Sequence, residues 1–308
     1  MMRTVRMMWF LVCLVLIVAL TSASDSSFDD QHNKPGWDPK ALHPCTIEQI
    51  TLTDFLARYG QQGGLPPLFP RPLIITNSHN ANNNNNNKNN INKRNQQFQN
   101  MTRSDNILHS FPENFTVTLS SSNSFSEHRR NIPLAGYLKE VNMGPTNPDM
   151  KANENWYLFG ETYSSEWKNF LRSYELPPCQ ACDNKFDENL IALSFGIGNS
   201  GSGVQWHVHG PGFSEALHGR KHWILYPPDY RPDFHPDQTS LNWMYYNYST
   251  ITNMEDKPLE CTLSPGDILY FPNMWWHATV NVDDYTAFVS TFTQEHLFVE
   301  TKQQRILY

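Results

Sequence analysis

The sequence predicts a mainly β protein, a barrel or sandwich of short strands with a few helices ahead of it, and three observations support this prediction. Short apolar stretches separated by glycine and proline turns dominate from about residue 190 onward, a spacing typical of all-β domains. Aromatic residues make up 13% of the chain and include nine tryptophans, which suits a densely packed β core. Two strands from distant parts of the chain carry histidines, at His207, His209 and His277.

The expected elements follow the apolar periodicity along the chain. The predicted strands cover residues 115–119, 190–195, 203–209, 222–226, 267–271, 278–282 and 287–292, and residues 73–75 form a short apolar segment. The predicted helices cover residues 51–60, 133–141 and 164–171, and the first begins near Thr51 and ends at Gly60 as helix-capping preferences require. We expect one folded domain over residues 44–300, with the aromatic, proline-bearing stretch 227–258 lying over the barrel mouth.

Residues 1–23 have the pattern of a secretory signal peptide. Arg3 and Arg6 precede an apolar core at 7–20, and small residues follow at 21–23, which is the order of a cleaved signal. The apolar core is shorter than the roughly 20 residues of a membrane-spanning helix; an uncleaved anchor is the alternative. We expect residues 24–43 to be a loose mature N-terminus and 301–308 a tail without a KDEL-type retention sequence. The predicted location is the endoplasmic reticulum lumen or the cell exterior.

Secretory entry makes disulfides the expected state of the cysteines. Four follow the signal segment and allow three pairings: Cys45, Cys179, Cys182 and Cys261. We favour a local Cys179–Cys182 bridge and a long-range Cys45–Cys261 bridge, with a zinc half-site or a redox dithiol as the alternative for the first pair. Three Asn-x-Ser/Thr sequons, the acceptor pattern for N-glycosylation, begin at Asn100, Asn114 and Asn247.

Composition limits the other possibilities. Residues 77–100 are dominated by asparagine, and such a tract has too little apolar surface to offset its own ordering entropy. We therefore expect a disordered insertion in a surface loop. The net charge of −7 argues against a nucleic-acid binder, whose footprint is basic.

The three histidines are placed to hold a metal ion. Side chains two residues apart on a strand point to the same face, so His207 and His209 share a face, and His277 comes from a different strand. The spacing around His277 resembles the second metal-binding hairpin of cupin barrels, Gly-x5-Pro-x-Gly-x2-His-x3-Asn. Its positions are occupied by Gly266, Pro272, His277 and Asn281, with Met274 in place of the second glycine.

The first cupin hairpin has His-x-His followed by Glu, which here resembles His207, His209 and a somewhat later Glu215. The resemblance implies a centre made by these three residues and His277, and the alternative for Glu215 is a structural ion-pair or strand-edge residue. Three imidazoles and a carboxylate would suit Fe(II), Mn(II), Ni(II) or Zn(II).

Several segments resemble those of the JmjC oxygenase family more closely. Residues 219–228 resemble its Gly-x-Lys-x-Trp-x-Leu-Phe-Pro-Pro segment, and residues 265–272 and 275–277 resemble its Pro-Gly-Asp-x-Leu-Phe-x-Pro and Trp-Trp-His segments. The resemblance covers roughly residues 155–294, the core of the expected domain. It implies a double-stranded β-helix, the jelly-roll or cupin fold, with flanking helices.

JmjC enzymes bind Fe(II) through His-x-Asp/Glu and a distal His, and bind 2-oxoglutarate through a Lys. The resemblance therefore implies that His207 is the first ligand, His277 the distal ligand, and Lys221 the partner of the 2-oxoglutarate carboxylate. His209 stands where the family has its carboxylate, and Val204 stands where related oxygenases often have a hydroxyl residue.

These departures favour a non-catalytic or weakly catalytic regulatory module that binds other proteins in the secretory pathway, with or without a divalent metal. One alternative is an Fe(II)- and 2-oxoglutarate-dependent hydroxylase of lumenal proteins. Another is a three-histidine cupin that uses no 2-oxoglutarate.

Overall fold

The computed structural model describes residues 36–66, 69–76, 94–141, 146–183 and 191–293. The expected signal peptide, the C-terminal tail and most of the asparagine-rich tract lie outside these ranges. None of the helices within them is long and apolar enough to span a membrane.

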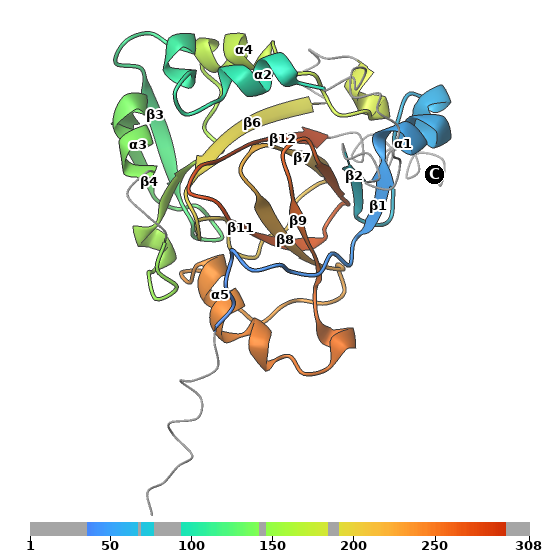
Figure 1. Cartoon of the computed structure of the whole chain (residues 1–308). Helices are drawn as coiled ribbons and strands as arrows, with labels where there is room; N and C mark the ends of the chain where they lie inside the picture. Colours follow the sequence, from blue (N-terminus) through green and yellow to red (C-terminus); the bar gives the residue numbers. More distant parts are fainter. Residues whose placement is uncertain (1–35, 67–68, 77–93, 142–145, 184–190, 294–308) are drawn as a thin grey trace, which may run out of the picture. The chain divides into compact units, whose positions relative to one another are not determined.

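Two β-sheets enclose a barrel, and Figure 1 looks along it. The larger sheet has nine strands in the order β1(Glu48–Thr51), β2(Leu73–Thr76), β10(Ile268–Phe271), β7(Gly212–His218), β12(Thr286–Thr293), β6(Ile191–Gly198), β5(Trp156–Leu158), β3(Thr116–Ser121) and β4(Arg129–Pro133). The smaller sheet has three in the order β11(Trp276–Asn281), β8(Lys221–Tyr226) and β9(Leu259–Leu263). This confirms the predicted mainly β, cupin-type fold with a few helices.

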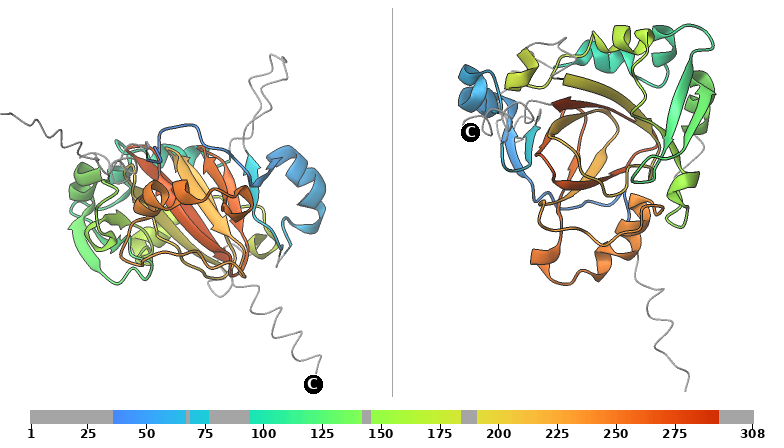
Figure 2. Two further views of the ribbon diagram at one scale, coloured as in Figure 1. Left: turned by 90° about the horizontal axis from the view of Figure 1, so that it is seen from below. Right: turned by 180° about the vertical axis from the view of Figure 1, so that it is seen from behind.

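The helices lie outside the barrel (Figures 1 and 2). They are α1(Leu52–Tyr59), α2(Gln96–Met101), α3(Leu134–Val141), α4(Ser165–Leu171) and α5(Ser240–Tyr246), with short 3-10 turns at η1(Gly60–Gln62), η2(Ile107–Ser110), η3(Ala152–Glu154), η4(Gln180–Asp183), η5(Tyr248–Thr250) and η6(Met254–Asp256). The Thr51 hydroxyl accepts from the Asp54 N–H at the start of α1, and the Ser164 hydroxyl accepts from the Trp167 N–H at the start of α4. Both are side-chain N-caps, so the predicted helix starts are confirmed.

Alternation along the strands divides the core into an inner and an outer layer. On β6, Phe195 and Ile197 pack outward against a cluster that includes Phe98 of α2 and Phe170 of α4. Gly196 between them faces inward, where a Cβ would overlap the Phe288 ring. Glycine at this position therefore admits the large Phe288 side chain of β12 into the barrel.

Residues 203–209 do not form the regular strand that the sequence predicted, although their backbone does hydrogen-bond to β11. His207 and His277 exchange two backbone hydrogen bonds at 3.0 and 3.1 Å, and the Thr279 N–H donates to the Val204 carbonyl. The register shifts by one residue between these two contacts. Gly203 lies directly on the Thr279 carbonyl, with no room for a Cβ. This irregular segment is followed by β7, which the periodicity did not reveal.

The aromatic stretch 227–258 does not lie over the barrel mouth as expected. Its helix α5 places Leu241, Trp243 and Met244 against Ile224 of β8 and Val280 of β11. These strand residues point away from the barrel interior, so the stretch covers the outer face of the smaller sheet (Figure 1).

The asparagine-rich tract ends earlier than the composition suggests. Residues 94–101 are folded, with Phe98 of α2 fully buried and Arg94 bound to the Glu215 carboxylate at 2.9 Å. One aromatic and one arginine therefore provide enough burial and pairing to order the end of the tract. Residues 77–93 lie outside the described structure.

The structure contains two disulfides, Cys45–Cys261 and Cys179–Cys182. This is the pairing that the sequence analysis favoured. The first joins the segment before β1 to β9 and so fastens the N-terminal segment to the smaller sheet.

Candidate metal centre

Three imidazoles meet inside the barrel. His207 and His209 come from the irregular segment before β7 and His277 from β11, and one ligand atom of each lies within 4.8 Å of the others. The ring centroids of His207 and His277 are 4.2 Å apart, and those of His209 and His277 are 4.6 Å apart. Among the described residues, no other group of three or more His, Cys, Asp or Glu side chains meets in this way.

Each ring is oriented by a backbone carbonyl. The Nδ1 atoms of His207, His209 and His277 lie 2.8, 2.7 and 2.8 Å from the carbonyl oxygens of Gln205, Gly210 and Trp275. A carbonyl can only accept a hydrogen bond, so each Nδ1 carries the proton and each Nε2 keeps a free lone pair. A hydrogen-bonded second nitrogen is the usual environment of a metal-binding histidine.

The Nε2 atoms of His209 and His277 lie 3.1 Å apart. With both protons held on Nδ1, these two nitrogens are acceptors and cannot hydrogen-bond to each other. Two nitrogens that bind one ion at about 2.0–2.1 Å lie about 2.8–3.4 Å apart in octahedral or tetrahedral geometry. The donor set therefore fits a divalent metal ion between the rings.

Burial keeps the three rings neutral. Desolvation lowers the pKa of His207 to about 3, and the nearby His209 adds to this effect. Desolvation likewise lowers the pKa of His277 well below its usual range and lowers that of His209. Neutral imidazole is the form that binds metals, so no proton has to leave Nε2 near neutral pH.

The cavity beside the histidines is about 20 Å³. It is lined mainly by aromatic side chains and a few polar ones: Phe159, Val204, Lys221, Trp223, Phe271, Thr279, Phe288, Ser290 and Phe292. A volume of about 10–15 Å³ holds one water, whereas small-molecule sites measure roughly 300–1,000 Å³. The cavity accommodates an ion or a water, and 2-oxoglutarate does not fit this arrangement.

Lys221 points into the same cavity from β8. Its side chain is 2% exposed, its Nζ donates to the Asn281 Oδ1 at 2.9 Å, and it lies 4.0 Å from the Phe288 ring centroid. Among the described residues, no carboxylate forms an ion pair with it. Desolvation lowers the pKa of Lys221 to about 7. Lys221 therefore points into the barrel, as the role implied by the JmjC resemblance requires, and no described carboxylate pairs with it.

Glu215 is not part of the centre, and the expectation that it replaces the missing carboxylate is wrong. On β7 its neighbour Ala216 packs with the inner cluster, so Glu215 points to the outer side. There its carboxylate accepts from the Tyr174 hydroxyl at 2.7 Å, from Arg94 at 2.9 Å and from Asn95 at 3.0 Å. The direction of a side chain can be counted from His207 only along a continuous regular strand. The irregular segment before β7 interrupts that count, so the sequence did not show which side Glu215 faces.

A second buried polar cluster was missed by the sequence analysis. On the outer face of the smaller sheet, His222 lies 3.3 Å from the Glu260 carboxylate and 2.9 Å from the Thr262 hydroxyl, and Tyr248 donates to Glu260. The alternation of β8 carries the signal, because Lys221 and His222 must face opposite sides. Thr279 and Asn281 could have been found in the same way, two and four residues after His277.

Comparison with known proteins agrees with this architecture. A family model described as "Cupin-like domain" matches residues 68–296. JmjC domain-containing protein 8 of Mus musculus and of Homo sapiens are each 36% identical to the chain over 251 residues, which is 80% of this chain and 82% and 83% of theirs.

Among solved structures, the ribosomal oxygenase YcfD from Escherichia coli, in complex with cobalt and succinic acid, matches 77% of this chain and 53% of its own with a TM-score of 0.38 and 17% identity. That likeness is too low to bear on mechanism. The family match and the two relatives are sufficient by themselves: the chain belongs to the cupin-like JmjC family.

Proposed function

We propose that this protein binds one divalent metal ion through His207, His209 and His277, and that it acts in the secretory pathway by binding other proteins, without turning over 2-oxoglutarate. Iron, zinc and other divalent ions of the first transition row suit three imidazoles. Bound there, the metal would supply a fixed positive centre that holds two segments of the barrel together, the one before β7 and β11.

The observation that carries this proposal is the combination of three imidazoles and a cavity of about 20 Å³. The iron site of JmjC oxygenases uses two imidazoles and one anionic oxygen. Here the third donor is neutral, and Phe159, Phe288 and Phe292 line the space beside it.

The secretory location rests on the leader-like residues 1–23 and is supported by two disulfides. The sequons add support, since Asn100 and Asn114 are exposed and Asn247 is half-buried. We propose glycosylation at these positions and residence in the endoplasmic reticulum lumen or export. Enzymatic removal of N-glycans from protein made in a secreting cell should reduce its apparent mass, and an unchanged mass would contradict this location.

The metal proposal is tested by elemental analysis of the purified full chain. We expect close to one equivalent of metal in the native protein and a loss of at least tenfold in His277→Ala. His128→Ala is the matched control, because His128 is exposed and lies just before β4, the terminal strand of the nine-stranded sheet. Equal metal contents in both variants would overturn the assignment.

One observation favours the alternative of an Fe(II)- and 2-oxoglutarate-dependent oxygenase. Lys221 is a buried cation without an acid, in the same cavity as the histidines, and a carboxylate ligand would pair with it. The discriminating measurement is succinate formation from 2-oxoglutarate with iron supplied. Turnover in the native protein that disappears in Lys221→Met would overturn the non-catalytic proposal.

A further inference from the structure

Residues 36–44, which we call the strap, cross the outer face of the smaller sheet from α5 to the segment before β1 (Figure 1). Trp37 is the one buried side chain of the strap, whereas Lys40 and Leu42 are exposed. No backbone hydrogen bond joins the strap to any other residue that the structure describes, and the exposed Lys40–Asp284 pair at 3.5 Å contributes little. Segments with few buried contacts and few backbone hydrogen bonds open locally at low cost.

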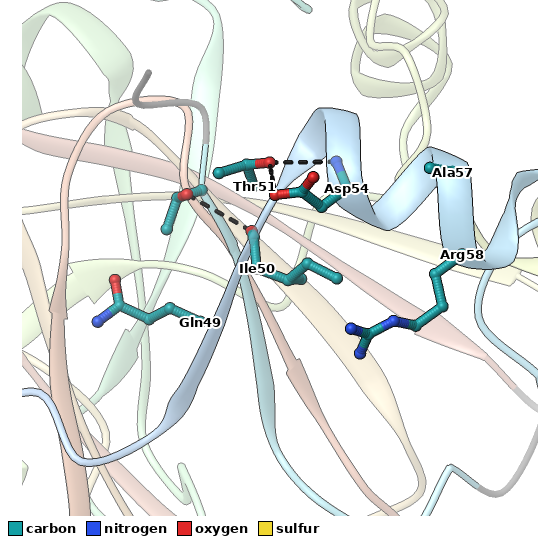
Figure 3. A pocket seen from close by; sticks show the side chains of 7 residues that line it. Gln49, Ile50, Thr51, Asp54, Ala57 and Arg58 are labelled. Carbon is teal, nitrogen blue, oxygen red and sulfur yellow. Dashed lines mark hydrogen bonds between the residues drawn. The ribbon is translucent and has the colours of Figure 1, made fainter. Parts of the chain in front are cut away.

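The chain that follows the strap is held firmly. Cys45 is bonded to Cys261 of β9. The Thr46 N–H donates to the Glu260 carbonyl at 2.8 Å, and the Thr46 hydroxyl accepts from the Glu260 N–H at 2.9 Å. Strand β1 comes next, and the Thr51 hydroxyl caps the first turn of α1 (Figure 3). The disulfide therefore marks a hinge, before which the chain can lift while the rest stays in place.

The strap is seated on a group of titratable side chains. The Trp37 ring stacks on His43 with centroids 4.5 Å apart and lies 5.1 Å from the His222 ring, and the two imidazoles are 5.2 Å apart. The Nε2 of His222 lies 3.3 Å from the Glu260 carboxylate, and both side chains are buried. Trp37, His43, His222 and Glu260 form what we call the seat.

The seat is incompletely hydrogen-bonded. The buried Nε1 of Trp37, Nε2 of His222 and Oε2 of Glu260 make no hydrogen bond to a residue within the described ranges. A buried polar atom without a partner costs about 1–3 kcal/mol relative to the same atom in water. Lifting the strap admits water to all three atoms, so the open strap regains hydrogen bonds that the closed strap gives up.

The charged and titratable groups that face His222 come from three elements. Glu260 belongs to β9, and His43 belongs to the strap. Tyr248 of η5 donates to Glu260, and the Lys257 ammonium lies 4.5 Å from the Tyr248 ring centroid. Helix α5, which packs on the same face, carries no charged residue. One carboxylate is therefore shared by two imidazoles and a phenol.

Burial under the strap makes His222 a weaker base. Burial is the largest cause of the lowered pKa of His222; Glu260 opposes the shift, and His43 adds to it. Lifting the strap removes this burial, so the open strap binds a proton more readily than the closed strap near the ordinary pKa of 6.5. The closed strap therefore has its full stability above pH 6.5 and loses stability as pH falls below it.

We propose that residues 36–44 form a pH-sensitive strap, which is closed at neutral pH and lifts from β8 and β9 on mild acidification, with the Cys45–Cys261 disulfide as its hinge. Lifting exposes Trp37 and the buried side chains beneath it. The protein thus presents a different outer face in acidic surroundings than in neutral ones. The inference goes beyond the proposed function and depends neither on the metal ion nor on a protein partner.

The test is fluorine NMR of the full chain labelled with 5-fluorotryptophan, in which Trp37→Phe identifies the Trp37 resonance. From pH 7.5 to 5 we expect this resonance to move toward its solvent-exposed position. The ratio of open to closed strap should rise by up to about tenfold per pH unit below 6.5. The Trp167 resonance should not move, because Trp167 packs against Phe195 of β6 in another cluster.

His222→Asn removes the titrating group and should abolish the pH dependence of the Trp37 resonance. His128→Asn is the matched control, because His128 is exposed and distant in sequence from the seat, and it should titrate like the native chain. Glu260→Gln is a second variant: without the opposing carboxylate, the ratio should rise between pH 7.5 and 5 at least as much as in the native chain. A smaller rise would identify Glu260 as the titrating group and overturn the proposal.

Hydrogen exchange, corrected for its intrinsic pH dependence, locates the hinge. The Thr46 N–H, bonded to the Glu260 carbonyl, should keep its protection while the Trp37 resonance moves. A Trp37 resonance that does not respond to pH, an unchanged response in His222→Asn, or joint movement of Trp37 and Trp167 would each overturn the strap. Metal content should be the same at both pH extremes of the His222→Asn series, so the metal proposal is tested separately.

Discussion

The inner and outer faces of the barrel wall accommodate buried charge in opposite ways. On the outer face the buried Glu215 carboxylate accepts from Arg94 and Tyr174, and the buried Glu260 carboxylate accepts from Tyr248 and lies 3.3 Å from His222. On the inner face Lys221 and three imidazoles surround a cavity without a carboxylate among the described residues.

The difference separates groups whose partners belong to the fold from groups to which we assign a ligand under the proposed function. A fully paired buried network rigidifies its surroundings, whereas unpaired buried groups are costly. The inner face presents the Nε2 lone pairs of three histidines to a cation, and its Lys221 amine donates to Asn281. On the outer face, Glu215 is paired with Arg94 and Glu260 accepts from Tyr248.

The largest expected effect tests the outer face. Glu215→Gln leaves Arg94 without its buried carboxylate and should lower the free energy of unfolding by about 3–5 kcal/mol. Urea denaturation at neutral pH measures this loss. Glu161→Gln is the control, because it removes the exposed Arg129–Glu161 pair, which should contribute less than about 1 kcal/mol. Similar losses in both variants would contradict the contrast between buried and exposed pairs.

Lys221→Met should raise the free energy of unfolding, whereas Glu215→Gln should lower it. The pKa of Lys221 is about 7 in the folded chain against an ordinary 10.5, so between these values the unfolded chain binds a proton that the folded chain lacks. The loss of folding stability caused by this lowered pKa is nearly complete at pH 7 and disappears toward pH 10.5. Removing it should stabilise the protein at pH 7 by about 2–4 kcal/mol. The gain should shrink as pH rises, and Lys139→Met should show neither effect. A loss of stability at pH 7 would show that the cation is paired.

A smaller effect follows from His222 on the outer face. Burial lowers its pKa below the ordinary 6.5, although Glu260 partly opposes the shift. Below pH 6.5 the unfolded chain gains a proton that the folded chain does not, so stability falls as pH falls, by up to about 1.4 kcal/mol per pH unit. We expect urea midpoints between pH 7 and 5 to decline less steeply in His222→Asn. Identical slopes would mean that the Glu260 carboxylate keeps His222 charged.

The smallest effect concerns the rim between the two faces. Met274 has a φ of 58°, a left-handed conformation that costs a side chain about 1 kcal/mol. Met274→Gly should therefore stabilise the protein by roughly 0.5–1 kcal/mol, after the entropy that glycine adds to the unfolded chain. Asn114→Gly, at a φ of 66°, is the matched control and should change little. Destabilisation by Met274→Gly would assign a stabilising contact to the thioether.

The sequence was sufficient for the fold and for most of the centre. The spacing of His207, His209 and His277 and the strand pattern around them predicted a barrel with a shared metal site, and those side chains do meet. Such patterns succeed because side-chain direction on a strand follows from a period of two. The role that the JmjC resemblance implied for Lys221 requires an inward lysine, and the structure places Lys221 in the cavity beside the histidines.

The failures arose where local pattern does not determine register or packing. Glu215 was misplaced because an irregular segment separates it from His209, so counting by twos from the histidines does not apply. The stretch 227–258 was misplaced because aromatic side chains can pack against many apolar surfaces. Its position is determined by the outward-facing side chains of β8 and β11, which the sequence pattern of the stretch does not reveal. The cavity volume was beyond sequence reasoning, because it depends on how Phe159, Phe288 and Phe292 fill the interior together.

The three carbonyls that orient the histidines have a consequence for how such a centre evolves. They belong to the main chain at Gln205, Gly210 and Trp275, and every amino acid supplies the same carbonyl. The side chains of Gly210 and Trp275 therefore take no part in orienting the rings, whereas the buried Gln205 side chain also donates to the carbonyls of Gln238 and Thr239. A lineage could exchange side chains beside this centre and still keep the three rings in the same orientation. A search for invariant side chains next to the histidines would overlook this backbone support.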